Sequence, residues 1–173
     1  MKRKLIFSAI IALAACFIPQ ASAQTLNVVQ GSVTYQYPAS ETGDMTYTHN
    51  GDSLTIAGKT FGTGQISKIY TDGTSVSDNT VSVSYDGATA SVTIAGNVAP
   101  YVTATVSGAH VNIAQADNLA DEITYTLSGA SSDGEFYMSG SYKATIELNG
   151  LTLTNATPVS SGAAVHIQNG KRI

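Results

Sequence analysis

Residues 123–129, Ile-Thr-Tyr-Thr-Leu-Ser-Gly, and residues 144–150, Ala-Thr-Ile-Glu-Leu-Asn-Gly, repeat one pattern 21 positions apart. In each, apolar and polar side chains alternate up to a leucine, and a polar residue and a glycine follow. Strict alternation is typical of a β-strand with one buried face, and the glycine predicts a tight turn after it. A shorter version follows, in which Val165 and Ile167 lead into Gln168-Asn169-Gly170.

A strand and a turn that recur at a period of roughly 20 residues predict a solenoid. Coils of this length suit a parallel β-helix, in which each rung stacks on the next at ~4.8 Å. In such a stack Val165 would lie under Ile146, and Glu147 and His166 would form a surface pair on adjacent rungs. About two and a half rungs and no cap precede residue 173, so we expect an N-terminal piece of a longer protein.

Residues 24–118 are predicted to form a β-rich N-terminal module of about eight strands, arranged as a sandwich or a meander. Asn-Gly and Asp-Gly pairs mark turns at short intervals along the chain. Residues 115–122 are expected to be a short helix or loop between this module and residues 119–173. The predicted fold class is therefore all-β, with a strand-rich module followed by the first rungs of a parallel β-helix.

Residues 1–23 have the pattern of a signal peptide. Basic residues at positions 2–4 precede an apolar run, and Ala21-Ser22-Ala23 offers a cleavage site before Gln24. Alternatively, Leu13-Ala14-Ala15-Cys16 resembles a bacterial lipobox, in which Cys16 would carry a lipid anchor. Both readings predict export, to the exterior, the cell surface or the periplasm of a bacterium.

The composition excludes several classes of partner. Removal of residues 1–23 would leave five Lys and Arg against twelve Asp and Glu, a net charge of −7. Such a chain has no basic patch for nucleic acid or for anionic lipid. The single Cys lies in the leader, so no disulfide framework is expected, and no apolar run of transmembrane length follows residue 23.

Acidic and aromatic residues gather around one predicted turn, at residues 133–142. Sugars are held by flat aromatic faces and planar polar groups, so Tyr137 and Tyr142 are candidate carbohydrate-binding residues. Calcium prefers carboxylate oxygens, so Asp133 and Glu135 are candidate metal ligands and calcium is the candidate cofactor. In the alternative interpretation, Phe136 fills the core and the two tyrosines only flank a strand.

Catalytic chemistry has little support in the sequence. No Gly-x-Ser-x-Gly elbow and no pair of histidines at metal-binding spacing occurs. His49, His110 and His166 lie far apart and are predicted to be surface residues of strands. No catalytic residue is therefore predicted, and we favour a binding protein over an enzyme.

Residues 122–138, 144–155 and 161–173 resemble the opening of a family of secreted bacterial carbohydrate-binding proteins. The phrase Leu-Asn-Gly-Leu-Thr-Leu-Thr-Asn, at residues 148–155, is the most specific part of the resemblance, which covers about residues 119–173. It implies a right-handed parallel β-helix like that of pectate lyases, and a non-catalytic protein that binds plant-type polysaccharide, with calcium involved. None of the family's calcium ligands can be mapped onto positions of this chain.

Two other functions stay open. The protein could be a polysaccharide lyase whose active site lies beyond residue 173, and Arg172, the single Arg after the leader, is the only Arg candidate for a base here. It could instead be a structural or adhesive β-solenoid of the cell surface. Downstream sequence would separate these functions, through clustered Asp with Arg or Lys for a lyase and through near-identical repeats for an adhesin.

Overall fold

The structure, a computed structural model, describes residues 24–48, 50–140, 143–170 and 173. These residues form strands and three short 3-10 turns without an α-helix, so the all-β prediction is confirmed. In this described part of the chain, no helix is long and apolar enough to cross a membrane. The predicted signal peptide and lipobox lie outside the described residues, as do His49, Tyr142 and Arg172.

A seven-stranded mixed sheet runs through the molecule in the order β13-β11-β7-β8-β2-β1-β6. Its strands are β1 (Thr25–Gln30), β2 (Val33–Pro38), β6 (Lys68–Asp72), β7 (Thr80–Asp86), β8 (Thr89–Ala95), β11 (Ile123–Ser131) and β13 (Ala144–Leu153). β7 pairs antiparallel with β8 and parallel with β11. The two regions that the sequence suggests, on either side of residue 119, therefore share one sheet.

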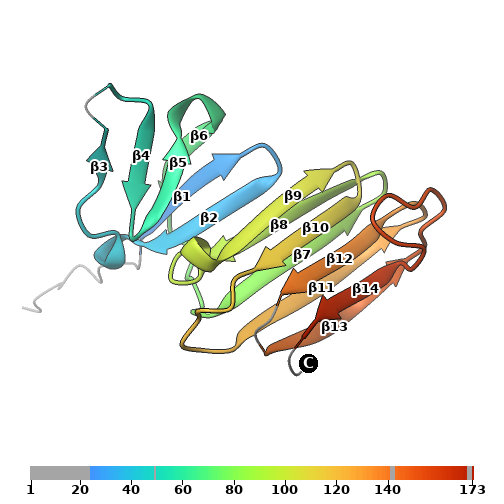
Figure 1. Ribbon diagram of the computed structural model, residues 1–173. Helices are drawn as coiled ribbons and strands as arrows, with labels where there is room; N and C mark the ends of the chain where they lie inside the picture. The colour runs from blue at the N-terminus through green and yellow to red at the C-terminus, as the bar shows by residue number, and fades with distance from the viewer. Residues whose placement is uncertain (1–23, 49, 141–142, 171–172) are drawn as a thin grey trace, which may run out of the picture.

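A four-stranded sheet, in the order β14-β12-β10-β9, covers one face of the larger sheet. Its strands are β9 (Val102–Ser107), β10 (His110–Gln115), β12 (Glu135–Gly140) and β14 (Val165–Asn169). Figure 1 shows these strands lying in front of β8, β7, β11 and β13. A third sheet at the N-terminal end contains β3 (Thr46–Tyr47), β4 (Ser53–Ile56) and β5 (Lys59–Gly62).

From β10 onward the chain alternates between the two large sheets. β10, β12 and β14 are parallel neighbours in the smaller sheet, and β11 and β13 are parallel neighbours in the larger one. Ile123 lies opposite Ala144 and Leu127 lies opposite Leu148, which is the register that the 21-residue repeat predicts. The described residues between 123 and 153 therefore hold no antiparallel hairpin.

The expected place of β14 is wrong. Val165 pairs with Phe136 of β12, not with β13, because one strand of the other sheet lies between successive parallel neighbours along the chain. His166 consequently lies beside Tyr137, whereas Glu147 lies beside Thr126 in the other sheet and accepts a hydrogen bond from its hydroxyl at 3.3 Å. The predicted surface pair of Glu147 and His166 does not form.

The turns predicted at Gly129 and Gly150 are also wrong. Both glycines lie inside strands with positive φ, +84° and +68°, and the pairing of β11 with β13 shifts between Ser128 and Ala130. A Cβ on Gly129 would lie 2.1 Å from the carbonyl oxygen of Tyr85. Gly129 thus permits a bulge through which β11 approaches β7 closely.

The core lies between the two large sheets, and two tyrosines cross it. The Tyr85 hydroxyl donates to the carbonyl oxygen of Glu135 at 3.1 Å, and the Tyr125 hydroxyl donates to Oε1 of Gln115 at 2.7 Å. Each bond links the larger sheet to the smaller one. Burial raises the pKa of both phenols, so they keep their protons and continue to donate.

Replacing Gly129 with alanine should lower the free energy of unfolding more than Gly150→Ala does. Both positions have positive φ, which costs a non-glycine residue about 1–2 kcal/mol. Only at Gly129 does the added methyl group meet backbone, because nothing lies within 4 Å of a Cβ on Gly150. Chemical denaturation of the two variants measures the difference, and equal losses would contradict the close approach of β11 and β7.

The outer edges of β13 and β14 should promote association. No described strand pairs with these edges, and Leu148, on β13, is 66% exposed. Unpaired edges with apolar side chains invite pairing between molecules. We expect the protein to self-associate or to bind hydrophobic dyes, and Leu148→Lys to reduce either effect. Sedimentation velocity and dye fluorescence test this, with Met45→Lys, at an exposed residue outside the strands, as the control.

Candidate functional site

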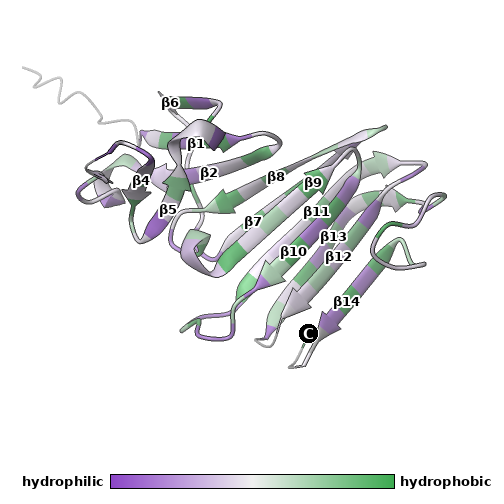
Figure 2. Cartoon of the chain, turned by 45° about the horizontal axis from the view of Figure 1, so that its top comes forward, coloured by the Kyte–Doolittle hydropathy of each residue, from purple (hydrophilic) through white to green (hydrophobic). Residues whose placement is uncertain are grey.

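The smaller sheet has one apolar face and one polar face. On β12, Phe136 and Met138 are fully buried, so Tyr137 between them points outward, and on β10 Asn112 points outward in the same way. Figure 2 shows the resulting alternation of hydrophobic and hydrophilic bands along these strands. We call the surface formed by the following residues the outer face: Thr105, Asn112, Tyr137, Ser139, His166 and Gln168.

Tyr137 lies at the centre of the outer face. It stands in register between Asn112 on β10 and His166 on β14. Its ring stacks on the His166 imidazole, with a centroid separation of 5.1 Å and an interplanar angle of 15°. Its hydroxyl donates a hydrogen bond to Oε1 of Gln168. The centre of the outer face is thus a stacked aromatic pair flanked by two amide side chains.

Asp133 fastens one part of loop 154–164, which joins β13 to β14. Its two carboxylate oxygens accept hydrogen bonds from the backbone N–H of Thr157 at 2.7 Å and from the Thr157 hydroxyl at 2.6 Å. These bonds lower the pKa of the Asp133 carboxyl, and the bond from the Thr157 hydroxyl has the largest effect. Gly134, next to it, donates its N–H to the carbonyl of Thr154 at 2.7 Å, which ties the start of the loop to the same turn.

Glu135 fastens the loop at a second point. Its carboxylate accepts hydrogen bonds from the backbone N–H of Ser160, at 2.8 Å, and from that of Ser161. The side chain is only 1% exposed. Burial alone would raise the pKa of this carboxyl, but the N–H donors of the loop outweigh it and the pKa is lowered. Glu135 therefore stays ionised beneath the loop at neutral pH.

His110 lies between these two carboxylates. Its Nδ1 is 3.7 Å from Oε2 of Glu135, and its Nε2 is 3.9 Å from Oδ1 of Asp133. The parallel register of β10 with β12 places His110 directly opposite Glu135. His110 lies on a strand, as predicted. Its side chain is only 16% exposed, so the prediction that it is a surface residue is wrong.

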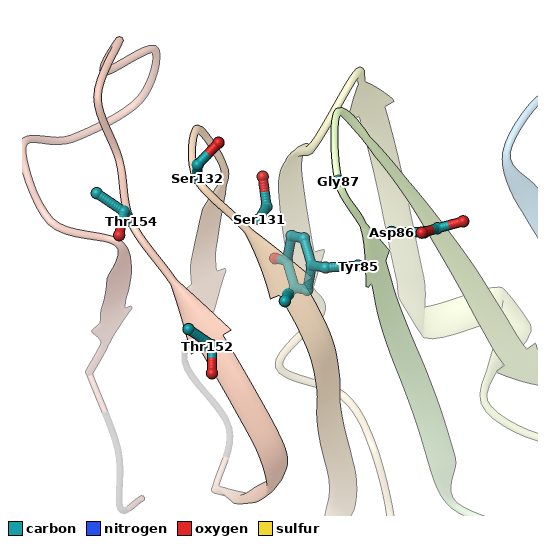
Figure 3. A pocket seen from close by; sticks show the side chains of 8 residues that line it. Tyr85, Asp86, Gly87, Ser131, Ser132, Thr152 and Thr154 are labelled. Atoms are coloured by element: carbon teal, nitrogen blue, oxygen red, sulfur yellow. The ribbon is translucent and has the colours of Figure 1, made fainter.

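Three hollows adjoin this cluster. One of about 290 Å³ lies on the outer face and is lined by Thr105, His110, Asn112 and Ser160, among others. A second, of about 320 Å³, lies between the β7–β8 and β9–β10 turns and also reaches His110. The largest, of about 470 Å³, lies at the ends of β7, β11 and β13 (Figure 3). The second hollow shares His110 with the first and Gly87 and Ser132 with the largest.

The hydrogen bonds of the Asp133 and Glu135 carboxylates that the structure shows are with the loop. All four oxygens of these carboxylates accept hydrogen bonds from loop 154–164. In the part of the chain that the structure describes, no three His, Cys, Asp or Glu side chains are placed to hold a metal together. Calcium dependence stays a prediction from the sequence alone.

Sequence reasoning found some of these residues and missed others. Tyr137, predicted for its aromatic face, lies at the centre of the outer face, and Phe136 fills the core, as its alternative interpretation proposed. The partnership of Tyr137 with His166 was missed, because it depends on pairing β14 with β12. The loop donors were missed because most are backbone N–H groups, which leave no signature in a sequence.

The hold of Glu135 on the loop should weaken in acid. Because the folded pKa lies below the ordinary value of 4.5, the stabilisation is present above that value and is lost as pH falls through the folded pKa. We expect the free energy of unfolding to fall as the pH is lowered below about 4.5. Glu135→Gln should lower stability at pH 7 and flatten this dependence in part, since Asp133 still titrates.

Chemical denaturation across pH 3 to 7, with limited proteolysis of the loop, measures both effects. Glu41→Gln, at an exposed carboxylate outside the cluster, is the matched control. An unchanged pH dependence in Glu135→Gln would show that this carboxylate does not fasten the loop.

No protein-family model, curated protein or solved structure matches this chain. The family resemblance of residues 119–173 therefore stays a prediction from the sequence. A function for the protein follows from the chemistry of the outer face and the hollows beside it.

Proposed function

We propose that this is an exported protein that binds polysaccharide without cleaving it, and that the outer face is its binding surface. The observation that carries the proposal is the row of Asn112, Tyr137 and His166 across three parallel strands. Pyranose rings present C–H surfaces that pack on flat aromatic rings, and hydroxyls that pair with amides. Tyr137 and His166 supply aromatic rings, each through the face that the other ring does not cover, and Asn112 and Gln168 supply the amides.

Strand geometry supports a polymeric ligand. Parallel neighbours repeat at ~4.8 Å, so outward side chains of β10, β12 and β14 form a ladder along which an extended chain can lie. We propose that these strands, with β11 and β13, are the first rungs of a parallel β-helix. From β10 onward the chain alternates between two sheets and its strands are parallel neighbours in each, which supports this interpretation.

Export also belongs to the proposal. It is supported by the basic and apolar segments of residues 1–23 and by the site at Ala21-Ser22-Ala23. A ligand outside the cytoplasm, such as a plant-type polysaccharide, is consistent with this destination. The scarcity of Lys and Arg favours recognition through stacking and hydrogen bonds over charge attraction.

Tyr137→Ala should weaken polysaccharide binding about tenfold, a loss of ~1.4 kcal/mol, because it removes the central ring and unstacks His166. Tyr47→Ala is the matched control, since Tyr47 is 62% exposed and lies on β3 of the three-stranded sheet, away from the outer face. Retention on cellulose-type and pectin-type polymers measures binding, first with calcium and then with a chelator.

An absorbance assay for unsaturated products, run beside the retention assay, tests for lyase activity. Retention that Tyr137→Ala and Tyr47→Ala affect equally would contradict the outer face as the binding surface. Absorbance that rises steadily with time would contradict a binding protein that does not cleave its ligand.

A further inference from the structure

The largest of these three hollows lies away from the outer face, and two serines and two threonines line it beside Tyr85, Asp86, Gly87 and Ala130. Ser131 ends β11, Ser132 follows it in the turn, and Thr152 and Thr154 come from the end of β13 and the start of loop 154–164. Figure 3 shows these four side chains around the hollow, with the Asp86 side chain pointing away from the two threonines. Two serines of one segment and two threonines of another thus line one space of about 470 Å³.

The bulge in β11 shapes this hollow. Gly129 lets the strand approach Tyr85 closely, and the shifted register then pairs Ala130 with Thr152. Ala130 is exposed and small, so it leaves room between the β7–β8 turn and the threonines. Bulges often re-aim side chains beside functional sites.

The three hollows are neighbours because they share lining residues, and we call the row that they form the path. It leads from Thr105 and Asn112 on the outer face, past His110, and over Gly87 and Ser132 to the hydroxyl-lined hollow. Among the described residues that line this path, none is Lys or Arg, while carboxylates of Asp86 and Asp133 lie along it. Such a path disfavours an anionic polymer and suits a ligand that is uncharged and rich in hydroxyls.

We propose that the hydroxyl-lined hollow is a second carbohydrate subsite, and that the ligand is a neutral glycan bound as an extended chain along the whole path. This inference rests on the proposed function of the outer face and names its substrate class. A short oligosaccharide occupies the outer face alone, and a longer one also reaches Thr152 and Thr154. Affinity therefore rises with chain length, because the second contact is made by a ligand already held.

Calorimetric titration tests the inference with β-1,4-linked hexasaccharides of glucose, xylose and mannose, their disaccharides, and the hexamer of galacturonic acid. We expect at least one neutral hexasaccharide to bind about tenfold more tightly than its disaccharide. The double variant Thr152→Val, Thr154→Val should weaken that hexasaccharide about tenfold, as expected for two lost hydrogen bonds, and leave the disaccharide unchanged. Tyr137→Ala should weaken both lengths.

Thr71→Val is the matched control, because Thr71 is exposed on β6, at the opposite edge of the larger sheet. Thermal unfolding midpoints check that each variant is folded. Equal affinity for hexasaccharide and disaccharide, or an effect of the double variant no larger than that of Thr71→Val, would overturn the second subsite. Tighter binding of the galacturonic acid hexamer would overturn the neutral class. Binding of none of the sugars would overturn the proposed function itself.

Discussion

Two tyrosines that cross the core set the relation between the two large sheets. Tyr85 and Tyr125 fill the space between the sheets and place their hydroxyls on acceptors of the smaller sheet, so the interior is packed without leaving those polar groups unpaired. Phe136 and Met138 of β12 point into this interior. A slip of one residue would bury Tyr137 and expose Phe136, which would remove the outer face altogether.

Two acidic residues beside the outer face hold loop 154–164 in place. Asp133 and Glu135 satisfy N–H and hydroxyl donors of loop 154–164, and the loop in turn supplies Ser160 to the hollow around His110. Charge-assisted hydrogen bonds of this kind are stronger than those between neutral groups. Asp133 and Glu135, which the sequence suggests as calcium ligands, therefore stabilise the position of loop 154–164.

Much of the fold could be predicted from local pattern, and the remainder depends on which strands pair. Alternation identified the strands around Tyr125 and Ile146 and their register, because both belong to one sheet. The place of β14 could not be predicted, because the repeat in the sequence relates β11 and β13 of the larger sheet, whereas β14 belongs to the smaller sheet. Gly129 was expected to end a strand in a turn. A glycine with positive φ is equally suited to a bulge within a strand, which is where Gly129 lies. His110 and Glu135 meet only through the register of β10 with β12.

The central claim is that the outward row on the smaller sheet binds glycan. Backbone amide spectra of the isotopically labelled protein, recorded during titration with a neutral hexasaccharide, test it most directly. We expect shift changes to gather at Asn112, Tyr137 and His166 and to continue along the path to Thr152. Changes confined to the outer surface of β1, β2 and β6, or spectra that do not change at all, would contradict it.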